Sequence, residues 1–347
     1  MIDKLKSVTK SGLLSAAGSF MAKRGCILCM HRVLPIGKKS PFPLPRDLEV
    51  STAYLEKLIK HFQALGYCFI TMDDMADFLN SSSKDRVMAL TFDDGYRDNL
   101  DFALPICESA GVPMTVYITT GLIDRSVDPW WYSLQSLILE RDYIFTDDLG
   151  EREGLKAITQ KEKEEAYLWI YKKIRKAGKE GGEVAERVWK ANGLSGVPSC
   201  GDLMMTWNEV RSLNDSPLVT VGAHTVSHPR LIWCDNREIE SEIIDSKARL
   251  EEKLDCKVRH LAYPHGSEKD IPEGISNLAT EAGYETAVTT IPRNLRNGDE
   301  RLYWTLPRKN VSGDNENLFD LECSVSGLNV LLNRRLRQRI KAVAGFQ

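Results

Sequence analysis

An apolar run that ends in two adjacent carboxylates constrains the fold of this chain most. The run Val87–Leu90 leads almost directly into Asp93, Asp94 and Gly95. A short continuous apolar run is typical of a buried strand, and successive strand side chains point to opposite faces. One carboxylate can therefore hold a metal while the other accepts a proton. Because adjacent carboxylates repel unless a cation or proton lies between them, the sequence predicts a buried strand that ends at a metal site.

Two histidines complete such a site. His224 and His228 have a spacing typical of zinc ligands, and they follow the apolar run Leu218–Ala223. Together with Asp94 they would give three protein ligands and an open fourth position, which is the layout of a catalytic zinc site. The alternative is a surface turn and two solvated histidines, and it would be favoured for either motif alone. The presence of both motifs, each after an apolar strand, argues against it.

Three motifs together resemble the signatures of the polysaccharide deacetylases, the carbohydrate esterases of the NodB-homology type. They are Thr91–Gly95 (TFDDG), His224–Pro229 (HTVSHP) and Ala262–Gly266 (AYPHG), of which the first two are specific and the third is degenerate. The resemblance extends from about Cys26 to about Arg308. It implies an α/β fold, a distorted (β/α) barrel of the NodB-homology type, together with a divalent metal, usually zinc.

The third motif departs from the family pattern at Ala262, where most members have an arginine that supports the catalytic aspartate. Arg308, which follows the strand-like run Leu302–Thr305, is our candidate for that role. Arg259 and Arg293 are rivals, and the sequence does not choose among the three. For each of them a surface position is an equal alternative.

The second departure is that no histidine follows His265, although the family usually ends with a strand that leads into a histidine. The strand-like run Cys26–Met30 leads into His31 at the other end of the chain. The first and last strands of a closed barrel are neighbours, so this relocation can preserve the site. The chain thus resembles the permuted branch of the family, whose members act on exopolysaccharides. The resemblance implies that His31 is the general acid; the alternative is a histidine that only caps a strand end.

The resemblance implies metal-assisted amide hydrolysis. Asp93 would take the proton of the attacking water, and His31 would protonate the leaving amine. The expected substrate is an N-acetylhexosamine in a bacterial polysaccharide or a lipid-linked glycan precursor. Two alternatives are a small-amide (ureide-type) hydrolase of the same superfamily and a glycan-binding pseudoenzyme. The intact metal and base residues argue against the pseudoenzyme.

Aromatic side chains near these motifs are candidates for sugar contact, because their ring faces suit the apolar C–H faces of sugars. Trp130 and Trp131 are expected on a loop, and we expect at least one of them to line a groove rather than pack in the core. Tyr96, Tyr263 and His265, which belong to the motifs or adjoin them, complete the predicted substrate-binding set.

Strand and helix signals alternate along most of the chain, which favours a parallel sheet. The predicted strands include 67–71, 113–119, 258–263 and 285–289, and the predicted helices include 53–65, 100–110, 237–254 and 275–281. The candidate site residues follow strands, and barrel active sites lie at the C-terminal ends of strands. A charged helical insertion, about 132–191, separates the two metal motifs, with Gln160–Lys176 its clearest helix and Gly178–Gly182 a predicted turn. It is expected near the site mouth, as a lid or as a scaffold.

Composition agrees with this interpretation. The chain has 347 residues, enough for one barrel of roughly 250 residues and an insertion, here placed at 26–325. A net charge of −3 argues against nucleic-acid binding. Eight scattered cysteines favour reduced thiols and a cytoplasmic protein.

Both ends of the chain are predicted to be amphipathic helices. Residues 1–25 are expected to form one, with a weak export signal as the alternative, and the basic segment 326–347 is expected to form the other. A basic amphipathic helix can lie on an anionic membrane or pack on the barrel, so peripheral association with the inner membrane is left open. The sequence does not indicate an oligomeric state.

Overall fold

The computed structural model describes residues 25–147, 153–194, 201–296 and 298–327. The two predicted terminal helices, 1–25 and 326–347, lie almost entirely outside the described residues. Among the helices that are described, none is long and apolar enough to cross a membrane.

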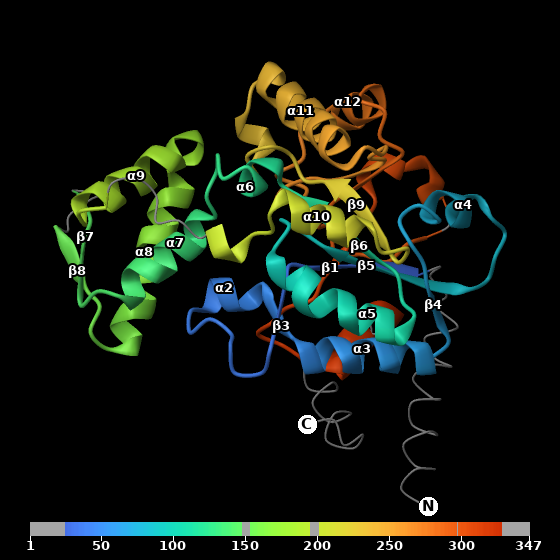
Figure 1. Ribbon diagram of the computed structural model, residues 1–347, viewed down its shortest axis with the longest axis horizontal. Coiled ribbons are helices and arrows are strands. Elements are labelled where there is room, and N and C mark those ends of the chain that lie inside the picture. The colour runs from blue at the N-terminus through green and yellow to red at the C-terminus, as the bar shows by residue number, and fades with distance from the viewer. Residues whose placement is uncertain (1–24, 148–152, 195–200, 297, 328–347) are drawn as a thin grey trace, which may run out of the picture.

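A curled parallel sheet forms the centre of the molecule (Figure 1). Its strands are β1 (Gly25–Met30), β4 (Tyr67–Phe69), β5 (Arg86–Phe92), β6 (Met114–Ile118), β9 (Val219–Ala223), β10 (His260–Ala262), β11 (Thr286–Val288) and β12 (Lys309–Asn310). Their order is β11-β10-β9-β6-β5-β1-β12, with β4 added beside β5, and every pairing is parallel. The predicted α/β fold with a parallel sheet is confirmed.

The first strand lies beside the last one. β1 pairs with β5 along its whole length and with β12 on its other edge, where Leu28 lies opposite Lys309. A parallel bridge between Val288 and Leu306 joins β11 to the segment that leads into β12. The two edges of the curled sheet therefore approach each other, as in the predicted distorted barrel.

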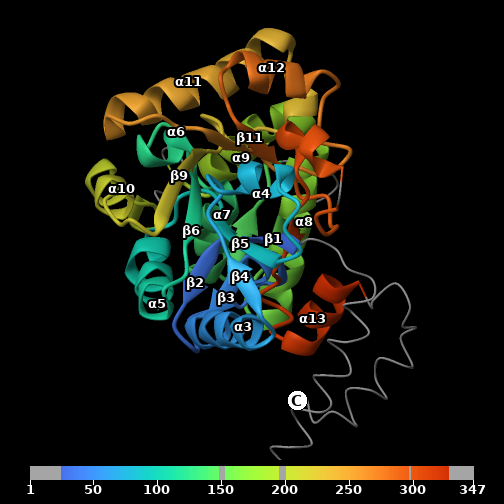
Figure 2. The same ribbon diagram turned by 90° about the vertical axis from the view of Figure 1, so that its right-hand side faces the viewer.

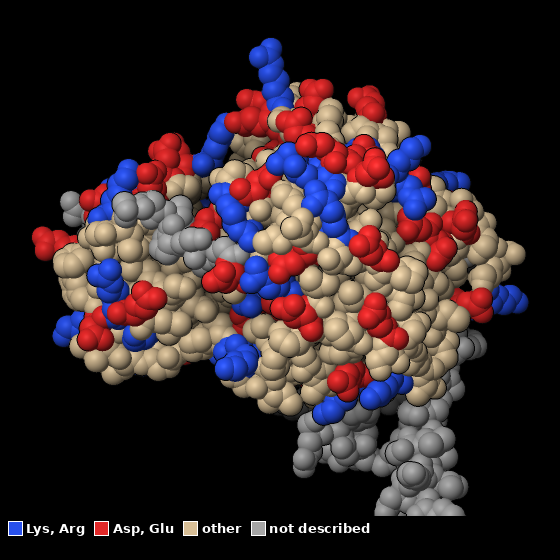
Figure 3. All heavy atoms as spheres, viewed as in Figure 1, with Lys and Arg blue, Asp and Glu red and all other residues tan. Residues whose placement is uncertain are grey.

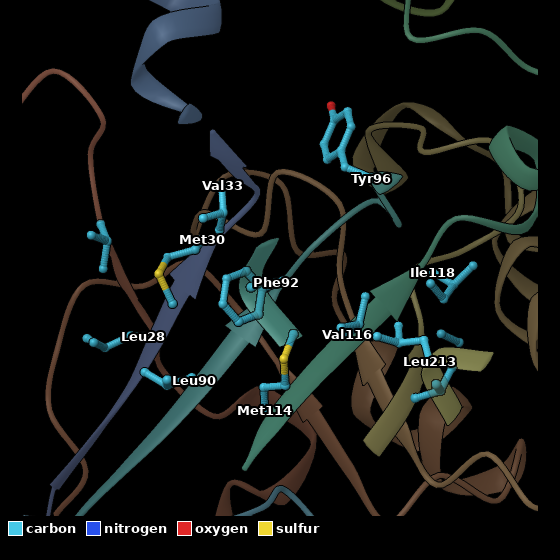
Figure 4. Close-up of a cluster of buried hydrophobic side chains, with 14 of the residues drawn as sticks. Leu28, Met30, Val33, Leu90, Phe92, Tyr96, Met114, Val116, Ile118 and Leu213 are labelled. Carbon is cyan, nitrogen blue, oxygen red and sulfur yellow. The ribbon is translucent and has the colours of Figure 1, made fainter. Parts of the chain in front are cut away.

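Both faces of the sheet are buried, which explains the near-continuous apolar runs of its strands. Leu28, Leu90 and Met114 lie in register across β1, β5 and β6 and point to the same side (Figure 4). They belong to the large outer core, which the surrounding helices cover. The alternate residues, such as Ile27 and Ala89, face a smaller inner core. Asp93, directly after β5, continues the alternation of Val87 and Ala89 toward this inner side.

The covering helices begin where side chains cap them. Ser51, Thr206 and Asp235 accept backbone N–H groups at the starts of α3 (Thr52–Ala64), α10 (Trp207–Asn214) and α11 (Asn236–Leu254). Figure 2 shows α3 with α5 (Leu104–Ala110) on one side of the sheet and α11 with α12 (Ile275–Glu281) on the opposite side. The remaining elements of the barrel are β2 (Arg32–Leu34), α2 (Pro43–Asp47), β3 (Glu49–Ser51), α4 (Met75–Asn80), α5 (Leu104–Ala110), α6 (Thr120–Ile123), α12 (Ile275–Glu281) and α13 (Leu318–Ser326).

The insertion forms a lobe beside the barrel, at the left of Figure 1. It contains α7 (Trp130–Leu139), a hairpin of β7 (Tyr143–Phe145) and β8 (Gly154–Lys156), α8 (Gln160–Lys176) and α9 (Gly181–Ala191). Its own apolar core includes the buried side chains of Tyr167 and Trp189.

The structure corrects two predictions for the insertion. It is not wholly helical, because three residues on each side of the hairpin pair as strands and bury Ile144 and Leu155. The predicted turn at Gly178–Gly182 is a short 3₁₀ helix, Gly178–Glu180, that continues directly into α9.

Basic and acidic side chains are interspersed over the face shown in Figure 3.

Candidate metal and active site

The C-terminal ends of four parallel strands bring the predicted site residues together. Asp93 and Asp94 follow β5, His224 follows β9, His265 lies beyond β10 and His31 follows β1. All five residues line a single cavity of about 670 Å³. Because every strand of the sheet runs in the same direction, these ends share one rim, as expected for a barrel enzyme.

Asp94, His224 and His228 converge on one point. Asp94 Oδ1 lies 3.5 Å from His224 Nε2 and 3.4 Å from His228 Nε2. This oxygen is buried, and among the described residues it has no hydrogen-bond partner. A buried acceptor without a partner is costly unless something else neutralises it. The donor set of one carboxylate and two imidazoles suits a divalent cation such as zinc.

The two histidines are prepared as ligands. The ring Nδ1 of His224 lies 2.7 Å from the carbonyl oxygen of Ala262, which can only accept, so Nδ1 carries the proton and Nε2 presents its lone pair. Burial lowers the pKa of both His224 and His228 to about 4. Both rings are therefore neutral at neutral pH, the form that binds metal.

Backbone strain is concentrated at this rim. Asp94, Thr225, His228 and His265 have positive φ angles of 76°, 64°, 57° and 61°. Such conformations cost of order 1–3 kcal/mol each for residues with a side chain and persist only where the surroundings fix them. The fold therefore holds these side chains in a geometry that the local chain does not favour.

Asp93 is held by Arg308. The Arg308 Nη1 and Nη2 atoms donate to Asp93 Oδ1 and Oδ2, each at 2.7 Å, and Nη1 also donates to Thr91 Oγ1 at 3.0 Å. Both side chains are almost completely buried. Burial by itself would raise the pKa of Asp93, but the charge of Arg308 and then that of His224 hold it well below its usual range. Asp93 thus stays an anion.

The rival arginines lie elsewhere. Arg259 pairs with Asp73 at 2.7 Å and Arg293 pairs with Asp299 at 2.7 Å. Of the three candidates, Arg308 is therefore the one that lies beside Asp93. The prediction that a strand, Leu302–Thr305, precedes it is wrong.

The segment Leu302–Thr305 is not a strand, because Tyr303–Thr305 form a 3₁₀ turn. The Thr305 N–H donates to the Leu302 carbonyl, and the Trp304 indole N–H donates to the Tyr284 carbonyl. Pairing with β11 begins only at Leu306.

His31 lies at the site from the opposite end of the sequence. One ring nitrogen of His31, the thiol of Cys29 and a carboxylate oxygen of Asp93 lie within 4.8 Å of one another. The backbone carbonyl of His31 accepts a hydrogen bond of 2.8 Å from the Asn99 amide. Pairing of β1 between β5 and β12 is what places this residue beside Asp93.

The aromatic candidates divide into two groups. Trp130, Trp131 and His265 line the cavity. The two tryptophans begin helix α7 and are not on a loop, since Pro129 precedes them as the N-cap residue. The Trp131 indole N–H donates to the Tyr96 hydroxyl at 3.3 Å, and its ring lies 5.7 Å from that of His228.

Tyr96 and Tyr263, which were predicted to bind substrate, lie in the apolar core, and Tyr96 also hydrogen-bonds with Asp94. Both side chains are fully buried in the outer core and neither lines the cavity. The Tyr263 hydroxyl donates to the Trp304 carbonyl at 2.9 Å, so this group is already satisfied inside the protein.

Sequence reasoning placed the insertion near the site but did not identify the residues that it contributes to the cavity wall. Tyr167, Tyr171 and Arg175 of α8 and Trp189 of α9 all line the cavity. The first three recur every four residues and so share one helix face, a spacing that could have indicated a common surface.

A family model described as polysaccharide deacetylase matches residues 80–287. No curated protein matches the chain significantly. Solved structures with a similar fold include the Streptococcus pyogenes deacetylase PplD in complex with acetate, with 16% identity, a TM-score of 0.53 and coverage of 83% of this chain and 92% of that one. IcaB from Ammonifex degensii has 17% identity, a TM-score of 0.54 and coverage of 85% and 94%. A de-N-acetylase from Aggregatibacter actinomycetemcomitans has 14% identity, a TM-score of 0.53 and coverage of 84% and 96%. At these identities the likeness shows a shared fold.

Proposed function

Because this chain belongs to the polysaccharide deacetylase family, carbohydrate esterases that hydrolyse N-acetyl amide bonds, we propose that it is a metal-dependent N-deacetylase. Its substrate would be an N-acetylhexosamine in a bacterial polysaccharide or a lipid-linked glycan precursor. The observation that carries this proposal is the unpartnered Asp94 Oδ1, which lies between two neutral imidazoles in the lining of the cavity.

Asp94, His224 and His228 would hold the metal. When bound, a divalent cation polarises the acetyl carbonyl and lowers the pKa of a coordinated water from 15.7 to about 7. The protein contributes ligands that are already neutral or anionic, so no proton has to leave the histidines at neutral pH.

Asp93 would accept the proton of the attacking water. Arg308 donates a hydrogen bond of 2.7 Å to each carboxylate oxygen of Asp93 and so fixes the plane of this carboxylate. The same pairing keeps Asp93 ionised and therefore ready to accept a proton. Arg308 acts here through Asp93 and is a positioning residue.

His31 would donate a proton to the leaving nitrogen. An amine leaves far more readily when it is protonated, and a general acid must lie within reach of it. His31 lines the cavity close to Asp93. Trp130 and Trp131, on the wall formed by α7, would receive the faces of the sugar rings.

The test is acetate release from defined N-acetylglucosamine oligomers, measured on protein treated with a chelator and then with added zinc. We expect release to depend on zinc and to leave one free amino group per acetate. If the oligomers stayed acetylated while a small cyclic ureide was hydrolysed, the small-amide alternative would replace this proposal. If neither substrate reacted with metal bound, catalysis itself would be in question.

A further inference from the structure

Helix α8 of the insertion places a cation inside the cavity. Arg175 lies in the last turn of α8, lines the cavity and donates from Nη1 to His265 Nδ1 at 3.3 Å. Its guanidinium lies 5.9 Å from the Tyr171 ring centre. In the described part of the chain, Arg175 forms no ion pair with a carboxylate within 4.0 Å. Arg175 therefore contributes a positive charge that contacts a ring nitrogen of His265 and the face of Tyr171.

A second cation in the same cavity is only partly neutralised. Arg230 follows the histidine pair, and its Nη1 lies 3.3 Å from Asp270 Oδ1. Among the described residues, the buried Arg230 Nε and Asp270 Oδ1 both lack a hydrogen bond. Burial lowers the pKa of Arg175, Tyr171 raises it, the charge of Arg230 lowers it and that of Asp270 raises it. The two guanidinium groups therefore repel each other, and Asp270 offsets only part of their combined charge. Arginine stays protonated in proteins, so an anion between them would relieve this repulsion.

The acidic residues of the cavity are engaged elsewhere. The carboxylates that line it within the described residues are Asp93, Asp94 and Asp128. Asp93 is neutralised by Arg308, and Asp94 would be a metal ligand. Asp128 comes just before α7 and bonds with Ser133 of that helix. Of these three groups, Asp93 is neutralised by Arg308 and Asp94 would be neutralised by the metal, whereas Asp128 keeps its charge and is hydrogen-bonded by Ser133.

Resting on the deacetylase function proposed above, we propose that Arg175 and Arg230 form a subsite for an anionic group of the substrate, a phosphate or a carboxylate. A guanidinium presents paired N–H donors that match either group bidentately. The substrate class is thus an N-acetylhexosamine glycan that carries negative charge. A phosphate at the reducing end, as in a lipid-linked sugar, and a substituent along the glycan are two sources of the same chemistry.

The test uses the full chain loaded with zinc and compares four tetramers of N-acetylglucosamine as substrates. One tetramer is neutral, and the others carry a reducing-end phosphate, a 6-phosphate or a reducing-end carboxylate. We expect kcat/KM for at least one anionic tetramer to exceed that of the neutral one by about 10-fold or more, as charge-assisted hydrogen bonds would give. In Arg175→Gln the ratio of kcat/KM for the anionic tetramer to that for the neutral tetramer should fall close to one. Which anionic tetramer is preferred identifies the source of the charge.

The matched control is Lys172→Gln, which removes the same charge from the exposed face of α8 and should keep the preference. Calorimetric binding of the same tetramers to Asp93→Asn, with and without Arg175→Gln, measures the subsite without catalysis. If no tetramer is deacetylated, the proposed function fails while binding still decides the subsite. Equal affinity and rate for neutral and anionic tetramers, or a preference that survives Arg175→Gln, would overturn the subsite.

Discussion

At the residue scale, the histidine pair gives the most direct test of the metal site. His224→Ala and His228→Ala each remove one of three ligands, and Asp94→Asn weakens the third. Metal affinity should fall by at least about 100-fold, because loss of an outer-shell partner alone costs 10–100-fold. Elemental analysis of purified variants would show metal and activity lost together. His61→Ala is the control, since that ring pairs with Glu322 away from the site. If the His224→Ala and His228→Ala variants still held about one metal ion per chain, the assignment of these histidines as ligands would be wrong.

Asp93 is expected to separate chemistry from metal binding. Asp93→Asn keeps the shape of the side chain but cannot accept the proton of water. The turnover rate should fall by roughly 10²–10⁴-fold while the metal content stays unchanged. Steady-state kinetics on N-acetylglucosamine oligomers measures the rate, and near-normal turnover would move the base to another residue.

His31 gives a third prediction, because its role depends on a strand at the start of the fold. His31→Ala should leave metal binding intact and slow amide hydrolysis by roughly 10²–10⁴-fold. Ester substrates should suffer less, since an alkoxide leaves with less need of a proton than an amine. His265→Ala is the comparison, because His265 lines the same cavity. A larger loss of amide hydrolysis in His265→Ala than in His31→Ala would assign the acid to His265.

At the element scale, Arg308 connects the entry of β12 with the end of β5. Arg308→Met leaves the buried Asp93 carboxylate without its partner, which typically costs about 3–5 kcal/mol. The double variant Arg308→Met with Asp93→Asn should recover much of that loss, because no isolated charge remains. Urea unfolding of the four proteins in this cycle measures the coupling. Arg259→Met is the control, because it removes one partner of the half-exposed pair with Asp73. If the losses of unfolding free energy in Arg308→Met and Asp93→Asn simply added in the double variant, the two residues would not be tightly coupled.

Sequence patterns predicted those elements whose apolar side chains repeat over many residues. Helix α8 has the predicted bounds, Gln160–Lys176, and the apolar runs before Asp93 and His224 are strands β5 and β9. Short elements were missed because tertiary contacts decide them. The three-residue strands β7 and β8 are defined by pairing with each other.

At the scale of the whole molecule, parallel topology explains why the site could be predicted and its surroundings could not. Strand ends in one parallel sheet must share a rim, so Asp94 and His224 were expected together although they are distant in sequence. The direction of a single aromatic side chain is not fixed in this way. Tyr96 and Tyr263 were therefore assigned to the substrate, whereas the structure buries both.

A cluster at the start of several strands also affects the whole molecule, through its pH dependence. Asp73 accepts from His260 Nε2 at 2.9 Å, pairs with Arg259 and accepts from Thr220, so it ties together β9, β10 and the segment before α4. The hydrogen bond from His260, with help from Thr220 and Arg259, lowers the pKa of Asp73 to about 2. A lowered carboxyl pKa contributes stability that is complete above its unfolded value, about 3.9, and is lost as pH falls toward 2.

The difference in melting temperature between the wild type and Asp73→Asn should therefore be constant above about pH 5 and shrink between pH 4 and 2. Thermal melts across this range measure it. Asp245→Asn, on the exposed face of α11, is the control. A difference that stayed constant down to pH 2 would show that the Asp73 cluster does not contribute in this way.

The pairing of β1 with β12 has a consequence for synthesis on the ribosome. Asp93 and Arg308 are separated by 215 positions, so most of the chain is made before the guanidinium that neutralises this carboxylate. Contacts between distant positions slow folding, and domains form as the chain emerges from its N-terminal end. Until Arg308 arrives, the nascent sheet must keep Asp93 hydrated and its edge at β1 unpaired. We expect the barrel to close only late in translation, with the catalytic carboxylate among the last groups to be buried.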